Sequence, residues 1–171
     1  MSKVVENLLT IGRLHTGTIK PETRPFNLKT LVAEKGLRLG QIADQKGSRL
    51  SIEIPGELEW LADESLVGAV LQNLLDNAVK FTPAGGAISV FMENERSICV
   101  RNTGAGISEK ILPDIFKHHV KTSLPGTGGE TGTGLGLPLS HDIMKAHGGE
   151  LGVKNEPGIG VAFFIRLPVT R

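Results

Sequence analysis

One predicted helix, over residues 63–82, carries polar side chains at a helical spacing. Asn73, Asn77 and Lys80 are four and then three residues apart, so they fall within roughly 60° of arc on one face. Carboxamide oxygens can ligate a hard cation such as Mg²⁺, and a lysine ammonium neutralises phosphate charge. This face therefore predicts the phosphate end of a nucleotide site, although a solvated helix face is the simpler interpretation of an isolated Asn-x-x-x-Asn.

Two glycine-rich segments strengthen the nucleotide interpretation. Residues 102–107 (Asn-Thr-Gly-Ala-Gly-Ile) follow a predicted strand, and residues 132–137 (Gly-Thr-Gly-Leu-Gly-Leu) open a predicted helix. Glycines let a ligand approach the backbone closely, and successive amides at a helix N-terminus can hold phosphate oxygens. Neither segment is a P-loop, because no Gly-Lys-Ser/Thr follows at the required spacing, and no parallel βαβ unit supports a dinucleotide fingerprint. Two such loops together with the Asn-Lys helix are strong evidence, whereas one loop is weak.

The elements that must position these residues are helices and hairpin-linked strands. Apolar periodicity and turn residues predict helices over 3–16, 27–47, 63–82 and 138–147, and strands over 50–54, 87–93, 97–102, 150–154 and 161–167. Asn27 has the residue type of an N-cap for the second helix. Because helices and strands do not alternate regularly, we expect an α+β sandwich in which helices cover a mainly antiparallel sheet.

Composition excludes several classes of protein. The 171 residues include 39% hydrophobic and 22% charged residues, which predicts a folded domain and not a disordered tail. The net charge of +1, without a dense basic run, predicts no nucleic-acid partner. Cys99 is the single cysteine, which excludes an internal disulfide framework, and its apolar neighbours predict a buried side chain. No apolar stretch has the length of a membrane span and the N-terminus lacks a leader pattern, so we expect a cytoplasmic chain.

Three segments together resemble the motifs of sensor histidine kinases. Residues 71–83 (LQNLLDNAVKFTP) closely resemble the N box of that family, residues 100–107 its G1 box, and residues 132–137 its G2 box. The resemblance runs from about residue 26 to the end of the chain. It implies the Bergerat ATP-binding fold, which is a two-layer α/β sandwich with a mixed, mostly antiparallel sheet covered by three helices.

The resemblance also implies a division of the chain. Residues 1–17 look like the end of the second dimerisation helix, and residues 18–26, which include Pro21 and Pro25, form a linker. Residues 27–171 are then the catalytic ATP-binding domain. The longer parent kinase is expected to be a homodimer, with membrane attachment left open.

The family's site residues carry over to this sequence one by one. Asn77 would ligate Mg²⁺, Asn73 would support the metal, Lys80 would contact phosphate, Phe81 would lie against the nucleoside, and Asn102 would accept from the adenine amine. Asn73 and Lys80 would also serve catalysis. The loop positions implied to shape the base pocket or bind phosphates are Gly104, Gly106, Ile107, Thr131, Gly132, Thr133, Gly134, Leu135, Gly136 and Leu137.

Two motifs depart from the family pattern. Asn102 stands where the G1 box usually has aspartate, and a neutral acceptor binds more weakly than a charged one. In the F box, residues 117–120 (Lys-His-His-Val) replace the acidic and second aromatic positions after Ile115-Phe116. Lys121 stands where the family often has an arginine near the γ-phosphate, so it is a third catalytic candidate. Residues 117–131 are expected to form a lid.

No histidine of the chain matches the phosphoacceptor motif. His15 precedes Thr-Gly, and His141-Asp142 lacks the proline that follows in the family. The resemblance therefore places the acceptor outside this chain. It implies ATP or ADP as ligands, the chain's own or a partner's dimerisation/histidine-phosphotransfer domain, and a response regulator as partners.

Three different functions remain open beside the histidine kinase. Related ATPases of the chaperone and gyrase type carry a general-base glutamate four residues before the metal asparagine, where this chain has Asn73. That difference favours transfer to a protein side chain over hydrolysis. An anti-sigma-type serine kinase is the second of these functions. A non-catalytic nucleotide-sensing or pseudokinase module is the third, because of Asn102 and the altered F box.

Overall fold

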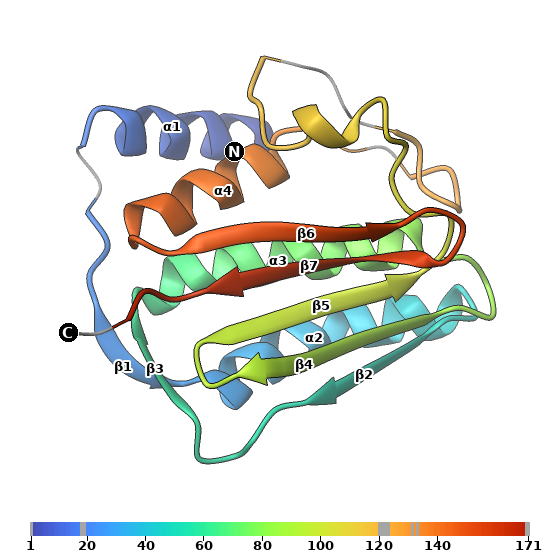
Figure 1. Ribbon diagram of the computed structural model, residues 1–171, viewed down its shortest axis with the longest axis horizontal. Coiled ribbons are helices and arrows are strands. Elements are labelled where there is room, and N and C mark those ends of the chain that lie inside the picture. The colour runs from blue at the N-terminus through green and yellow to red at the C-terminus, as the bar shows by residue number, and fades with distance from the viewer. Residues whose placement is uncertain (1, 18–19, 120–123, 131, 133, 170–171) are drawn as a thin grey trace.

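The structure is a computed structural model that describes residues 2–17, 20–119, 124–130, 132 and 134–169. Figure 1 shows its elements in order along the chain. The helices are α1 (Lys3–His15), α2 (Leu28–Gln45), α3 (Glu64–Phe81) and α4 (Gly136–Ala146), with a 3₁₀ turn at Leu112–Asp114. The strands are β1 (Arg24–Asn27), β2 (Arg49–Glu53), β3 (Glu59–Ala62), β4 (Ala87–Asn94), β5 (Ser97–Thr103), β6 (Glu150–Glu156) and β7 (Gly160–Arg166).

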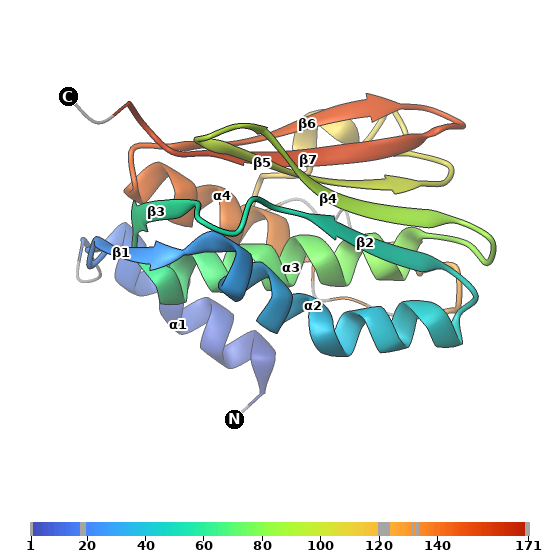
Figure 2. The ribbon, with the colours of Figure 1, turned by 90° about the horizontal axis from the view of Figure 1, so that it is seen from below.

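The main sheet has the strand order β2-β4-β5-β7-β6. The β2–β4 pair is parallel and the other three pairs are antiparallel. In Figure 2, α2, α3 and α4 lie in one layer against one face of this sheet, and α1 packs on α4 outside that layer. The predicted α+β sandwich, with a mostly antiparallel mixed sheet backed by three helices, is confirmed, and α1 is an additional helix at its margin.

The helices α2 and α3 begin at side chains that cap their first turns. Asp63 Oδ1 accepts a hydrogen bond from the backbone N of Leu66 at 3.0 Å, and Asn27 Oδ1 accepts one from the backbone N of Thr30 at 2.9 Å. Each bond satisfies an amide that a helix leaves unpaired at its start, which typically stabilises the helix by about 1 kcal/mol. The predicted N-cap at Asn27 is confirmed.

One face of α3 forms the centre of the core between the helices and the sheet. Full burial of a leucine side chain contributes roughly 1.5–3 kcal/mol, so this face fixes the helix against its neighbours. Its buried members are Val67, Val70, Leu71, Leu74, Leu75, Ala78 and Val79. The polar residues Asn73, Asn77 and Lys80 are only half-buried. Within the described residues, no helix combines the length and the apolarity needed to cross a bilayer.

The strand β1 was not predicted from the sequence. It pairs antiparallel with β3, and Phe26 lies opposite Trp60, with both side chains buried. The Trp60 indole N–H donates to the backbone O of Glu95 at 2.9 Å, which ties this small ladder to the main sheet. Pro25 argues against a central strand, but among the described strands β1 pairs only with β3, and an edge strand tolerates proline.

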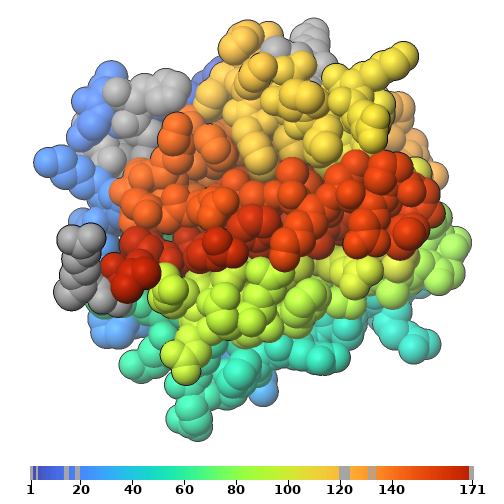
Figure 3. Space-filling view, in the orientation of Figure 1, coloured from blue at the N-terminus to red at the C-terminus, as the bar shows by residue number. Residues whose placement is uncertain are grey.

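The other face of the main sheet is turned toward the viewer in Figure 3. Phe164 on β7 is covered by two cations, because the Lys154 ammonium lies 5.5 Å and the Arg166 guanidinium 5.2 Å from its ring centre. Cys99 pairs with Phe164 in the ladder and is 2% exposed, as predicted. Burial is the main cause that raises the pKa of Cys99 to about 11, so its thiol is neutral at physiological pH.

Candidate functional site

Two adjoining cavities lie between α3, the segment leading into α4, and the ends of β5 and β7. The first has a volume of about 390 Å³ and the second about 420 Å³, each of a size typical of small-molecule sites. Both are lined by the same five residues, Asn77, Phe81, Ile115, Leu124 and Leu137. Because they share these walls, the two cavities are the two halves of one elongated site.

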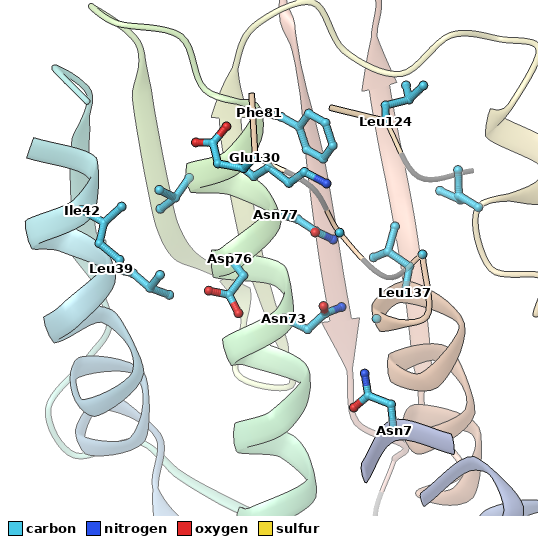
Figure 4. Close-up of a pocket in the computed structure, with 16 residues that line it drawn as sticks. Asn7, Leu39, Ile42, Asn73, Asp76, Asn77, Phe81, Leu124, Glu130 and Leu137 are labelled. Carbon is cyan, nitrogen blue, oxygen red and sulfur yellow. The ribbon is translucent and has the colours of Figure 1, made fainter. Parts of the chain in front are cut away.

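The first half, here called the polar cavity, gathers the predicted phosphate-binding residues. Asn73, Asn77 and Lys80 reach it from α3, and Gly132, Gly134 and Gly136 line it from the segment at the start of α4. In Figure 4, Asn73 and Asn77 point from α3 toward Leu137, whereas Asp76 points toward α2. The structure therefore brings together two motifs that are more than fifty residues apart in the sequence.

The second half, here called the apolar cavity, contains the predicted base-binding residues of the G1 segment. Asn102, Gly106 and Ile107 line it together with Val161 and Phe163 of β7. Asn102 is 5% exposed, and its Nδ2 donates to the backbone O of Thr103 at 3.1 Å. This bond engages Nδ2, so the side-chain acceptor that Asn102 can offer a ligand is Oδ1. An apolar slot with one buried acceptor suits a flat base that carries an amino group.

Two hydrogen bonds from Asn155 of β6, here called the brace, hold the G1 segment in place. The Asn155 side chain donates through Nδ2 to the backbone O of Ile107 at 2.7 Å and accepts at Oδ1 from the backbone N of Ile107 at 2.8 Å. Gly106 has a φ of +75°, and a Cβ there would lie 2.8 Å from Asn155 Oδ1. Gly104, with a φ of +148°, does not line the cavity but donates to the backbone O of Ile159 at 3.0 Å. Asn155 had no signal in the sequence, because only strand pairing brings it to Ile107.

Lys80 is a partly desolvated cation in the lining of the polar cavity. Burial is the main cause that lowers the pKa of Lys80, and the negative charge of Glu130 opposes this shift. The ammonium lies 4.8 Å from the centre of the Phe81 ring. A cation that has lost part of its water and lies beside an aromatic wall is well placed to pair with an anionic ligand.

Asn73 connects α3 to α4. Its Nδ2 donates to Ser140 Oγ at 3.1 Å, and its carboxamide packs against Gly136, so that a Cβ there would displace the carboxamide. Asn77 makes no such bond within the described residues and lines both cavities. The two asparagines therefore differ in placement, because Asn73 is committed to the contact with α4 while Asn77 faces the shared part of the site.

Several residues of the site were not predicted. Asn7 reaches the polar cavity from α1, as Figure 4 shows, and Leu39 and Ile42 reach it from α2. Ile11 of α1 packs against the core, which brings this helix next to α4. No local pattern could have found Asn7, since its position depends on the packing of α1 against a helix far along the chain.

The altered F box contacts α4. Phe116 stacks on His141 with ring centres 5.0 Å apart, and His118 Nε2 lies 2.6 Å from Asp142 Oδ2. Burial is the main cause that lowers the pKa of His141, and the charge of Lys145 lowers it further. These contacts hold the segment after the 3₁₀ turn against the helix that opens with the G2 motif.

Three predicted site residues, Lys121, Thr131 and Thr133, lie outside the described residues. The remaining predicted G2 positions do not all contact the site equally. Gly132, Gly134, Gly136 and Leu137 line the polar cavity. Leu135 is the N-cap residue of α4 and makes no side-chain capping bond.

Comparisons by sequence and by structure found known proteins that are similar to this chain. The family model "Histidine kinase-, DNA gyrase B-, and HSP90-like ATPase" matches residues 62–171. Sensor protein SrrB of Staphylococcus aureus (strain MRSA252) is 31% identical to this chain over an alignment of 171 positions. The alignment covers 98% of this chain and 29% of SrrB. The catalytic domain of histidine kinase ThkA has a TM-score of 0.74 and 29% identity, covering 86% of this chain and 95% of its own. Full-length ShkA has a TM-score of 0.75 and 27% identity, covering 96% of this chain and 35% of its own.

The family match begins at the end of β3 and includes α3, both glycine segments and α4. It therefore contains the residues that line the polar cavity from α3 and from the G2 segment, and those that line the apolar cavity. The chain spans 29% of the length of the SrrB sequence that it matches. The resemblance to sensor histidine kinases is confirmed, and the chain belongs to the family of histidine kinase-, DNA gyrase B- and HSP90-like ATPases.

Proposed function

We propose that this chain is the ATP-binding catalytic domain of a sensor histidine kinase, and that it transfers the γ-phosphate of ATP to a histidine outside the chain. The observation that carries the proposal is the joined site itself. A polar cavity with Asn77, Lys80 and the glycine amides adjoins an apolar cavity that contains the buried acceptor Asn102. The structure of ShkA in complex with AMPPNP, at 27% identity, supports the same use of the site.

The apolar cavity binds the adenine ring in this proposal. Asn102 Oδ1 accepts from the adenine amine while its Nδ2 stays bonded to Thr103. Ile107, Val161 and Phe163 cover the ring. The neutral acceptor gives a weaker hydrogen bond than a carboxylate would, so moderate nucleotide affinity is expected.

The polar cavity binds the phosphates. Magnesium prefers oxygen ligands, so the Asn77 carboxamide oxygen would hold the ion, while Asn73 positions α4 through Ser140. Bound there, Mg²⁺ would neutralise part of the phosphate charge. Lys80 pairs with phosphate, and the amides at the start of α4 add the positive end of the helix dipole.

The reaction is an in-line displacement that the site promotes by position and charge. A neutral imidazole nitrogen of the acceptor histidine attacks the γ-phosphorus and forms an N–P bond. The bond from that phosphorus to the bridging oxygen breaks, and its electrons leave with ADP. Lys80 and the α4 amides offset the charge on the departing diphosphate, and Lys121 is proposed to serve the γ-phosphate from the lid.

The proposed setting of the domain follows from the same family. Residues 1–17 end a dimerisation helix, residues 18–26 link it to the domain, and residues 27–171 form the domain. Its partners are a dimerisation domain that carries the acceptor histidine and a response regulator. The domain acts in the cytoplasm, as part of a homodimeric parent.

Binding of nucleotide tests the proposal directly. Calorimetric titration with ADP and AMPPNP should give micromolar-to-millimolar affinity that increases with Mg²⁺. Asn77→Ala should remove the Mg²⁺-dependent part, because the proposed ligand oxygen is lost. Gln72→Ala, a carboxamide control on α3 outside both cavities, should bind as the native chain does. Mg²⁺-dependent affinity that survives in Asn77→Ala would take Asn77 out of the metal site.

A nucleotide-sensing module without transfer is the second candidate, favoured by Asn102 and by the contacts of the altered F box with α4. An assay that adds a dimerisation domain carrying an acceptor histidine, together with ATP labelled at the γ-phosphate, distinguishes the two functions. Label on the histidine supports the kinase. Nucleotide binding without transfer of label supports the sensing module.

A further inference from the structure

Lys46, the residue that caps the C-terminus of α2, reaches across to the end of α3. Its side chain is 17% exposed. The ammonium donates to the backbone O of Val79 at 2.8 Å and of Lys80 at 3.2 Å. These carbonyls belong to the last turn of α3, where a helix leaves its acceptors without intrahelical partners. Lys46 thus binds the turn of α3 that carries Lys80 and Phe81.

The same ammonium binds the turn formed by residues 126–130, at the end of the expected lid. It donates to Thr127 Oγ1 at 3.0 Å and pairs with Glu130 Oε1 at 2.7 Å. Glu130 Oε2 in turn accepts from the backbone N of Gly128 at 2.9 Å. Both oxygens of Glu130 are therefore engaged, one by the cation and one by the backbone of its own turn.

This turn is also attached to α3 through its backbone. The N–H of Thr127 donates to the backbone O of Lys80 at 3.0 Å, and Thr127 Oγ1 lies 3.1 Å from the backbone O of Thr82. Gly126 lies so close to Lys80 that a Cβ there would be 2.7 Å from the Lys80 backbone O. The turn and the last residues of α3 form one unit, and Lys46 is the side chain that contacts both parts.

The negative charge of Glu130 in this unit affects the polar cavity. Glu130 and Lys80 both line it, and the negative charge of Glu130 acts on the Lys80 ammonium. Within the described residues, Lys80 makes no salt bridge, whereas Glu130 makes its salt bridge with Lys46. A nucleotide phosphate at Lys80 would bring like charge toward Glu130, and an adjacent cation offsets that repulsion.

We propose that Lys46 is a positioning residue for the phosphate site: it holds Glu130 and the 126–130 turn at the end of α3, and so keeps Lys80 for the nucleotide phosphate. This inference rests on the proposed nucleotide function. Without Lys46, the carboxylate of Glu130 moves to Lys80 and competes with phosphate. The effect of Lys46 on affinity therefore depends on the charge at position 130.

A double-mutant cycle tests this dependence. Lys46→Met should weaken binding of ADP and AMPPNP about tenfold, a size typical of coupling between charged groups in contact, and leave adenosine binding unchanged. Lys46→Met combined with Glu130→Gln should recover most of that affinity, because the competing charge is gone. Lys46→Arg should bind within about threefold of the native chain, since the cation is kept. Lys29→Met, on the exposed side of α2, is the matched control and should have no effect.

The outcomes separate this inference from the proposed function. If the native chain binds no nucleotide, both are overturned. If the native chain binds and the double variant is as weak as Lys46→Met, Lys46 is only a structural cap and the positioning role is wrong. If thermal unfolding shows that Lys46→Met is not folded, the single variant Glu130→Gln tests the inference instead. This variant should bind ADP more tightly in the absence of Mg²⁺, because the negative charge near the phosphate site is gone. Unchanged or weaker binding in that variant overturns the inference.

Discussion

The two halves of the site are built in different ways. The apolar cavity lies at the end of paired strands, where ladder pairing sets Asn102 of β5 opposite Val161 of β7 and Asn155 of β6 opposite that same residue. The polar cavity lies among helix ends and loops, with residues from α1, α2, α3, the loop residues Leu124 and Glu130, and the start of α4. Asn102, Val161 and Phe163 of the first half belong to a ladder of backbone hydrogen bonds, whereas the described residues that line the second half include none from a strand.

This difference predicts how the halves respond to change. The apolar cavity is held by strand pairing and by the bonds of Asn155 to Ile107, so a substitution there should weaken binding of every ligand that contains the base and should also destabilise the fold. The residues that line the polar cavity come from separate helices and loops, so a substitution there should weaken binding of ligands with phosphates and spare adenosine. Comparison of adenosine with ADP therefore shows which half a variant affects.

The largest effect is expected for Gly106→Ala at the apolar cavity. A side chain is strained at its φ of +75°, and the added Cβ would lie 2.8 Å from Asn155 Oδ1, so Asn155 must shift and its bonds to Ile107 are weakened. We expect destabilisation by about 2–4 kcal/mol and at least a tenfold loss of affinity for both adenosine and ADP. Thermal unfolding and calorimetric titration measure the two effects.

Gly85→Ala is the control for Gly106→Ala. Gly85 has a similar φ of +81°, but a Cβ there has no atom within 4 Å, so this variant carries the backbone cost alone. It should lose about 1 kcal/mol of stability and keep its affinity for nucleotide. Equal behaviour of the two variants would mean that the brace from Asn155 contributes nothing.

A smaller and more selective effect is expected for Gly136→Ala at the polar cavity. The new methyl group meets the Asn73 carboxamide, which must leave Ser140 and change the position of the α4 amides. ADP and AMPPNP should bind about five- to tenfold more weakly, while adenosine binds normally. Stability should change little, because the lost hydrogen bond is offset by the higher helix propensity of alanine.

Gly40→Ala in α2 is the matched control, because a Cβ there makes only an ordinary contact, 3.7 Å from Leu50. It should gain about 0.5–1 kcal/mol of stability and leave binding unchanged. If Gly136→Ala weakens adenosine as much as ADP, the proposed independence of the two halves is wrong.

The smallest effect concerns the contact between the altered F box and α4. Burial lowers the pKa of His141 below its ordinary value of 6.5, with Lys145 adding to the shift and Asp142 opposing it. The unfolded chain therefore takes up this proton at a higher pH than the folded chain does. The corresponding stability is present above about pH 6.5 and is lost as the pH falls through the folded pKa of His141.

Unfolding by urea at several pH values between 5 and 7.5 measures this contribution. His141→Phe keeps an aromatic ring for Phe116 and should flatten the dependence in that range. Lys145→Met, which removes one cause of the lowered pKa, should flatten it partly. A slope in His141→Phe equal to that of the native chain would show that other groups produce it.

The sequence by itself determined the elements and the motifs with local spacing. The apolar face of α3 and the common face of Asn73, Asn77 and Lys80 follow from a period of 3.6 residues. The N-cap at Asn27 follows from its residue type. The fold class followed from the order of helices and hairpins. The family resemblance followed from motifs that each lie within one short segment, and the comparisons confirmed it.

Only the tertiary structure decided which distant residues complete the site. Asn155 meets Ile107 through strand pairing, Asn7 reaches the polar cavity through helix packing, and Lys46 meets Glu130 across 84 positions of the chain. β1 remained hidden because Pro25 contradicts a strand unless the strand lies at an edge. The physical reason is common to all four. Helical and turn patterns record interactions between near neighbours, whereas these contacts depend on how whole elements pack, which no local spacing encodes.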